Sequence, residues 1–215
     1  MGTSNCIDYG VVSAAVAHYA KFGYQQIEVP WWVTAGIANI TKPTGVLASS
    51  NYKLSVNGKC LLASGEQAFL YLANKGQLSP GKYQTVTPCF RNEEYDAEHS
   101  KQFMKLELIR LLPASESATQ SMVQELAGHA LELFKSLAGD AAAFCDIILT
   151  GVKDPLAETM TEQLDVVLTV PQRDGSGSNI ELGSYGARRT AFATWIYGTG
   201  IAEPRFTKTL RRSWV

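Results

Sequence analysis

A densely charged segment lies between two apolar stretches near the middle of the chain. It contains Arg91, Glu93 and His99, and Phe103 and Glu107 follow it. An arginine can fork onto a phosphate, a glutamate can accept a hydrogen bond from an amino group, and a phenylalanine can stack on a flat base. Charged side chains that point inward from a sheet are costly unless a charged ligand compensates them. The segment therefore predicts a nucleotide site that uses no glycine-rich loop.

Two expected strands flank this segment. Residues 83–91 and 102–111 alternate or run apolar, which is typical of strands. We therefore expect a hairpin whose polar loop carries the charged side chains. Phe103, Lys105 and Glu107 alternate along the second strand and so share one of its faces.

Each of these residues also has an ordinary structural interpretation. Arg91 and Glu93 could simply pair across a strand, as most charged pairs do. Phe103 by itself is more typical of a core, and His99 by itself is more typical of a solvated loop. The functional interpretation depends on finding these residues together with further matching motifs.

The rest of the chain predicts helices and strands in an irregular order. Helices are expected over residues 7–22, 66–75 and 119–137 and at the C-terminus. Strands are expected over residues 24–29, 52–56, 59–62, 141–149, 163–170, 179–184 and 192–197. Asn57-Gly58 is a hairpin signal, residues 198–200 are expected to form a glycine turn, and residues 34–50 look like a mobile connection. Strand pairs without regular βαβ alternation predict an α+β fold, an antiparallel β-sheet flanked by helices, in one domain over residues 1–215.

The composition fits a globular protein inside the cell. The chain has 215 residues, of which 46% are hydrophobic and 18% charged, so it can bury a full core. Lys and Arg (19) nearly balance Asp and Glu (20), which gives no sign of a basic surface for nucleic acid. The four cysteines show neither zinc-ligand nor disulfide-framework spacing. No stretch approaches the roughly 20 apolar residues that span a bilayer, so we expect a cytoplasmic protein with no membrane partner.

Three motifs, in order along the chain, resemble the signatures of class II aminoacyl-tRNA synthetases. The middle one is FRNE at residues 90–93, followed by His99, Phe103 and Glu107. Residues 23–30 (GYQQIEVP) are similar to the first signature, a helix and then a strand that ends in a proline at the dimer interface. Residues 198–205 (GTGIAEPR) resemble the third, a glycine turn that leads to an arginine at a helix start. The resemblance implies the class II catalytic fold and a homodimer with Pro30 at its interface.

Several segments are most similar to the seryl enzymes of this family. Residues 61–66 (LLASGE) resemble the loop in which a Thr or Ser and a Glu hold the amino-acid ammonium group. Residues 87–91 and 102–107 also resemble seryl segments, although the loop between them has the shorter length of lysyl and pyrrolysyl relatives. Residues 180–184 (IELGS) resemble the strand whose glutamate binds ATP through magnesium, and their continuation, residues 186–189 (GARR), is also similar to ammonia-dependent asparagine synthetase. One of the two arginines in GARR is expected to be functional and the other to lie on the surface.

The resemblance assigns a role to each matched residue. ATP would be bound by Arg91 at the α-phosphate, Glu93 at the adenine amino group, His99 at the β- or γ-phosphate, Phe103 and Arg205 on the two adenine faces, and Ser184 and Glu181, with Mg²⁺ on Glu181. The amino acid would be bound by Ser64, Glu66 and Glu107, with Thr199 lining its side-chain pocket. Arg91 and Arg205 would be the catalytic residues, because in-line attack of a carboxylate on the α-phosphorus needs positioned cations more than a general base.

Two departures from the family pattern bear on function. Glu203 and Pro204 stand before Arg205, where the family has an apolar residue and then a small or acidic one, and the carboxylate could compete for Arg205. The chain also begins close to the first motif and ends about three turns after the third. This leaves no room for a tRNA-binding domain, so we do not expect tRNA charging by the usual recognition unless a partner supplies that domain.

Together these observations predict a homodimeric enzyme that condenses ATP with a small amino acid to give an aminoacyl adenylate. The acceptor could be tRNA, a carrier protein or a small molecule. The alternative is a paralogue that has lost catalysis and acts as a regulatory or ligand-binding subunit. A plain tRNA-binding module is disfavoured by the near-neutral charge.

Overall fold

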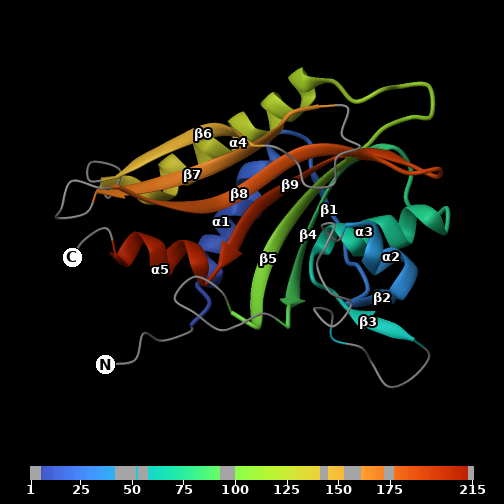
Figure 1. Ribbon diagram of the computed structural model, residues 1–215, viewed down its shortest axis with the longest axis horizontal. Coiled ribbons are helices and arrows are strands. Elements are labelled where there is room, and N and C mark those ends of the chain that lie inside the picture. Colours follow the sequence, from blue (N-terminus) through green and yellow to red (C-terminus); the bar gives the residue numbers. More distant parts are fainter. Residues whose placement is uncertain are drawn as a thin grey trace.

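The computed structural model describes residues 6–41, 52, 58–92, 100–140, 145–152, 161–171 and 177–212. Seven strands of this part form one sheet in the order β1-β4-β5-β9-β8-β7-β6 (Figure 1). Their bounds are β1 Gln25–Gln26, β4 Gly81–Phe90, β5 Gln102–Leu111, β6 Asp146–Val152, β7 Gln163–Pro171, β8 Gly177–Arg189 and β9 Thr194–Glu203. Every pairing is antiparallel except that of β1 with β4. The expected α+β class is confirmed.

Two helices cover one face of the sheet, α1 (Tyr9–Ala20) and α4 (Gln120–Ala138) (Figure 1). The α4 sequence places apolar residues three and four positions apart, and this stripe is buried against the strands. Asp8 is the N-cap of α1, and its carboxylate accepts the N–H groups of Gly10 and Val11. It is followed by Gly23 at φ +81°, a conformation that favours glycine.

The opposite face carries a smaller layer. It consists of a two-stranded sheet, β2 (Trp32–Thr34) and β3 (Lys59–Leu61), and of the helices α2 (Ala35–Ile40) and α3 (Gly65–Asn74). Their apolar side chains bury Ile109 and Leu111 of β5 and Trp195 and Tyr197 of β9. This layer therefore holds the N-terminal end of α3 against β5 and β9.

The sequence-based expectations fail for the residues of α2 and β1. Residues 35–40 form α2 where a mobile connection is expected, and residues 42–50 lie outside the described residues. Strand β3 pairs with β2, a partner that the Asn57-Gly58 hairpin signal does not predict. The N–H of Leu61 also donates to the carbonyl of Tyr52 at 2.9 Å, but residues 53–57 lie outside the described residues, so the expected hairpin stays a prediction. The expected strand over residues 24–29 is reduced to two residues, because only Gln25 and Gln26 pair with β4.

The expected glycine turn at residues 198–200 is also wrong, because β9 runs through it without a break. A Cβ on Gly198 would lie 2.6 Å from the Tyr185 ring, and one on Gly200 would lie 2.7 Å from Cγ of Leu106. These glycines therefore serve close packing between strands and are not needed for a change of chain direction.

A β-bulge interrupts the pairing of β5 with β9. The register shifts between Leu106 and Glu107, so that Glu107 lies opposite Thr199. Two tyrosine hydroxyls donate to carbonyls at this irregularity, Tyr185 to Thr199 at 2.8 Å and Tyr19 to Gly200 at 3.1 Å. These bonds satisfy backbone carbonyls of β9 that the bulge would otherwise leave unpaired.

The last described element is α5 (Arg205–Arg212), which begins two residues after the end of β9 at Glu203. Its Phe206 is buried and lies 5.5 Å from the ring of Phe134 in α4, measured between ring centroids. Among the described residues, no helix is long and apolar enough to cross a membrane.

Candidate active site

A buried carboxylate, Glu107, lies in the middle of the sheet on the face that carries α3. It is 1% exposed and stands opposite Thr85 of β4 and Thr199 of β9. The start of α3 lies directly on it, because a Cβ on Gly65 would come within 2.9 Å of the Glu107 Cβ. Only glycine allows this approach of the helix to the sheet.

Two donors bind the same oxygen of Glu107. The Ser64 hydroxyl donates to Oε2 at 2.6 Å, and the Lys105 ammonium lies 2.9 Å from the same atom. Ser64 is also the N-cap of α3, where its hydroxyl accepts the N–H of Glu66 at 3.4 Å. Ser64 therefore joins the helix start to the sheet carboxylate.

A second buried carboxylate, Glu66, is held by Arg188 and Trp195. Nη1 of Arg188 donates to both oxygens of Glu66, at 3.0 and 2.8 Å, and Nε1 of Trp195 donates to Oε1 at 2.7 Å. The Arg188 guanidinium also stacks on the Tyr197 ring, 3.9 Å from its centroid. Arg188 is therefore the buried arginine of the two that follow one another in β8, whereas Arg189 is exposed.

The end of the β4–β5 hairpin brings Arg91 and Phe103 together. The Arg91 guanidinium carbon lies 5.2 Å from the centroid of the Phe103 ring. Nε of Arg91 donates to the carbonyl of Ala63 at 3.1 Å, which ties the hairpin end to the residue before Ser64. A cation that can bind phosphate therefore lies beside the loop that leads to Glu66 and Glu107.

Arg205 and Glu181 meet at the same end of the sheet. Nη1 of Arg205 lies 3.5 Å from the carbonyl oxygen of Glu181. Glu181 is exposed, and Ser184 of the same strand is half-buried opposite Asp165 of β7. Residue 203 of β9 pairs with Met104 of β5, so Arg205 follows directly on the strand end that adjoins Phe103.

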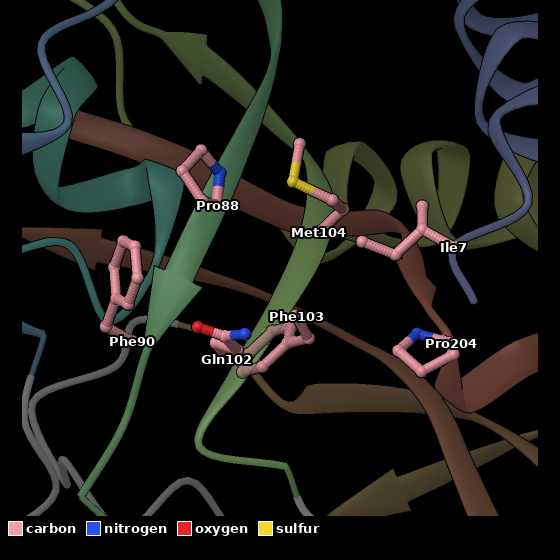
Figure 2. Close-up of a pocket in the computed structure, with 7 residues that line it drawn as sticks. All are labelled: Ile7, Pro88, Phe90, Gln102, Phe103, Met104 and Pro204. Carbon is pink, nitrogen blue, oxygen red and sulfur yellow. The ribbon is translucent and has the colours of Figure 1, made fainter. Parts of the chain in front are cut away.

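A cavity of about 240 Å³ lies behind this end of the sheet (Figure 2). Its wall includes Pro88, Phe90, Gln102 and Met104, which pair across β4 and β5 and share the face opposite to Arg91 and Lys105. Ile7, Phe103 and Pro204 complete the wall. Because Phe103 and Pro204 line one cavity, the residue before Arg205 lies near the expected adenine platform.

Cys89 lies on the same strand face as Arg91 but is not a candidate nucleophile. Burial raises the pKa of its thiol to about 11, although the nearby Lys105 and Arg91 act to lower it. A thiol with this pKa is almost entirely protonated at neutral pH, and the thiolate is the reactive form. Burial and this raised pKa therefore make Cys89 a poor nucleophile at neutral pH.

The described residues contain no group of three or more His, Cys, Asp or Glu side chains that could hold a metal ion. Mg²⁺ commonly binds through only one or two carboxylates, the phosphates of its nucleotide and several waters. Glu181 is exposed, and its backbone carbonyl lies beside Arg205, so its carboxylate fits this kind of site, in which the metal arrives with the nucleotide.

The structure brings most of the expected site residues into three neighbouring groups. These groups are Ser64, Glu66, Glu107 and Thr199; Arg91 and Phe103; and Arg205 and Glu181. Glu93 and His99 lie outside the described residues. Pro30 is half-buried between β1 and β2, and its role in a dimer stays a prediction.

Sequence reasoning missed Trp195 and did not separate Arg188 from Arg189. Arg188 stands opposite Trp195 in the β8–β9 pairing, and both side chains point to Glu66. A fully buried tryptophan needs an acceptor for its N–H, but the sequence does not say which one. Lys105 was detectable, because it alternates with Phe103 and Glu107 on one strand.

No protein-family model and no curated protein sequence matches the chain, but solved structures do. The cytoplasmic serine-tRNA ligase of Naegleria fowleri, in complex with AMP, is similar with a TM-score of 0.70 and 20% identity, over 93% of this chain and 46% of that one. The seryl-tRNA synthetase of Pyrococcus horikoshii, complexed with ATP, is similar with a TM-score of 0.71 and 16% identity, over 94% of this chain and 49% of that one. The pyrrolysyl-tRNA synthetase PylSc of Desulfitobacterium hafniense is similar with a TM-score of 0.65 and 17% identity, over 95% of this chain and 69% of that one.

These similarities show that the chain has the catalytic fold of class II aminoacyl-tRNA synthetases, as the motifs predict. The chain spans about half the length of the two seryl enzymes that it matches.

Proposed function

We propose that the protein activates a small amino acid with ATP. An oxygen of the amino-acid carboxylate attacks the α-phosphorus, the bond to the β-phosphate oxygen breaks, and the products are an aminoacyl adenylate and pyrophosphate. No proton has to be removed from the attacking group. The site therefore has to align two anions and to stabilise the charge that develops between them.

The amino-acid ammonium group is assigned to Glu107, with Ser64 and Glu66 beside it. Both donors that the described residues supply to Glu107 reach Oε2, so Oε1 is the oxygen that an ammonium group can use. Thr199 stands opposite Glu107 and is buried, so it borders the space for the amino-acid side chain. Trp195 and Tyr197 are bulky, buried residues of the same strand as Thr199, and alternation places them on its face of β9, which supports a small amino-acid side chain.

ATP is assigned to the neighbouring end of the sheet. Arg91 would bind the α-phosphate, and Phe103 and Arg205 would hold the adenine from two sides. Glu93 and His99 would complete the contacts to the adenine amino group and to the terminal phosphates. Glu181, with Ser184 on the same strand, would hold a Mg²⁺ ion that neutralises charge on the phosphates.

One observation carries this assignment: Arg91 is tied to the carbonyl of Ala63, the residue that precedes Ser64. Ser64 in turn donates to Glu107. The cation for the α-phosphate and the carboxylate for the ammonium group are thus linked through two consecutive residues. This is the proximity that a carboxylate needs to reach the α-phosphorus.

A second candidate function is a ligand-binding or regulatory subunit without catalysis. The observation that favours it is that both oxygens of Glu66 are already bonded to Arg188. The acceptor of the activated amino acid, whether tRNA, a carrier protein or a small molecule, belongs to the proposal, as does a homodimer with Pro30 at its interface.

Pyrophosphate exchange with a panel of amino acids tests the catalytic proposal. We expect exchange that depends on a small amino acid and on Mg²⁺, and its loss in Arg91→Ala. Absence of exchange with every amino acid, together with calorimetric binding of an amino acid but not of ATP, would establish the second candidate instead.

A further inference from the structure

Glu203, at the end of β9, is a completely buried carboxylate. It pairs with Met104 of β5 and so lies on the sheet face that α1 covers, opposite to the face of Phe103 and Lys105. Burying a carboxylate is costly unless donors surround it. The fold must therefore supply those donors on the α1 face.

Two neighbouring residues supply them. The backbone N–H of Thr207 donates to Oε1 at 3.0 Å, and the Thr207 hydroxyl lies 2.9 and 2.8 Å from the two oxygens. The backbone N–H of Asp8 donates to Oε2 at 3.3 Å. Arg205 forms no ion pair with Glu203 in the described part of the chain, so the competition that the sequence suggests does not occur.

The side chain of Glu203 caps the N-terminus of α5, a role that the side chain of the N-cap residue usually has. The carbonyl of Pro204 accepts the N–H of Lys208 at 3.0 Å, which makes Pro204 the N-cap residue. A proline side chain has no oxygen to accept the free N–H groups of the first turn. Glu203 therefore accepts the N–H of Thr207, the third residue of the helix.

The same carboxylate joins α5 to α1. Asp8 is the N-cap of α1, and its own N–H is the one that reaches Glu203. The Glu203 carboxylate thus lies between the N-terminal ends of two helices, and both ends favour a negative charge. Glu203 therefore holds the start of α5 through Thr207 of that helix and through Asp8 at the start of α1.

Arg205 is the first residue of α5, two positions after Glu203. Its guanidinium reaches across to the carbonyl of Glu181. Because the direction of the first turn of α5 decides where this side chain lies, the groups that fix the turn also fix Arg205. We propose that Glu203 is a positioning residue that holds Arg205 in the ATP site through the first turn of α5; this inference rests on the proposed function.

Glu203→Gln tests the inference with little change in shape. The amide replaces one acceptor oxygen with a donor nitrogen. The N–H groups of Thr207 and Asp8 therefore cannot both keep the acceptor that they have in the wild type. We expect the KM for ATP in pyrophosphate exchange to rise at least about tenfold, with the KM for the amino acid unchanged. We also expect faster hydrogen–deuterium exchange at the N–H groups of Thr207 and Asp8 in the folded variant.

Glu125→Gln is the matched control, because Glu125 is a more exposed carboxylate in α4 that contacts Lys82. It should leave both KM values and the two amide exchange rates unchanged. Thr207→Val is a second variant that removes the hydroxyl and keeps the backbone donor, and it should raise the KM for ATP less than Glu203→Gln does.

Several results would overturn the inference. They are an unchanged KM for ATP in folded Glu203→Gln, an equal rise of both KM values, or unchanged exchange of the two amides. If the wild-type protein neither exchanges pyrophosphate nor binds ATP, the proposed function fails. Amide exchange in Glu203→Gln then decides separately whether Glu203 fixes the start of α5.

Discussion

The buried ion pair of Glu66 with Arg188 makes the sharpest prediction about stability. The side chains are 5% and 16% exposed, so Arg188→Met would leave an almost fully buried carboxylate without its cation. Removing one partner of a buried pair costs about 3–5 kcal/mol, and we expect the lower end because Trp195 still donates to Glu66. For a domain of this size, a loss of about 3 kcal/mol lowers the Tm by about 6–12 °C.

The assay is urea unfolding followed by circular dichroism, with Arg189→Met as the control. Arg189 is the exposed neighbour on the same strand, so its substitution should change the free energy of unfolding by less than about 0.5 kcal/mol. The double variant Glu66→Met with Arg188→Met should recover only part of the loss, because it replaces both charges with apolar groups but leaves the buried N–H of Trp195 without its acceptor. If Arg188→Met unfolds at the same urea concentration as Arg189→Met, the buried pair is not what holds α3 on the sheet.

Three further predictions follow from the site and its surroundings. Burial raises the pKa of Glu203 above its usual value near 4.5, so the folded chain binds this proton more tightly than the unfolded chain does. The stability of the wild type relative to Glu203→Gln, measured by urea unfolding, should therefore fall as the pH rises above the usual pKa of a glutamate, and a rise would contradict the burial argument. Gly65→Ala should lose about 1–3 kcal/mol of unfolding free energy because its Cβ would meet Glu107, whereas Gly128→Ala in α4 meets nothing and should not destabilise. A thiol reagent should label only the exposed Cys6 in the folded protein and all four cysteines in denaturant, and fast labelling of Cys89 in the folded protein would refute its raised pKa.

The sequence predicts the sheet and the long helix well because their patterns are local. Strands β4 and β5 alternate or run apolar within ten residues each, and α4 repeats apolar residues over 19. The pairing of β3 with β2 depends instead on contacts between segments far apart in the chain. No local signal near residue 58 reports that partner, so the pairing could not be predicted from the residues around β3.

The candidate site likewise contains some residues that local patterns predict and others that depend on contacts between distant segments. Phe103, Lys105 and Glu107 share a face because they alternate on one strand, and Ser64 follows from the resemblance of residues 61–66 to the seryl-enzyme loop. The bonds from Arg188 and Trp195 to Glu66 join strands β8 and β9 to α3 over more than 100 residues of sequence. Glu203 shows most clearly what the sequence does not reveal. Its position two residues before Arg205 suggests that it pairs with that arginine, but the strand directs the Glu203 side chain to the face that α1 covers, where it binds Thr207.

Titration with a stable aminoacyl-sulfamoyl adenosine tests most directly whether ATP and an amino acid share this site. The account predicts that the analogue binds more tightly than AMP or the free amino acid. It also predicts that Arg91→Ala and Glu107→Gln each weaken binding by at least about tenfold, since each removes a hydrogen bond to a charged group. Binding no tighter than that of AMP, with no effect of Glu107→Gln, would contradict the account.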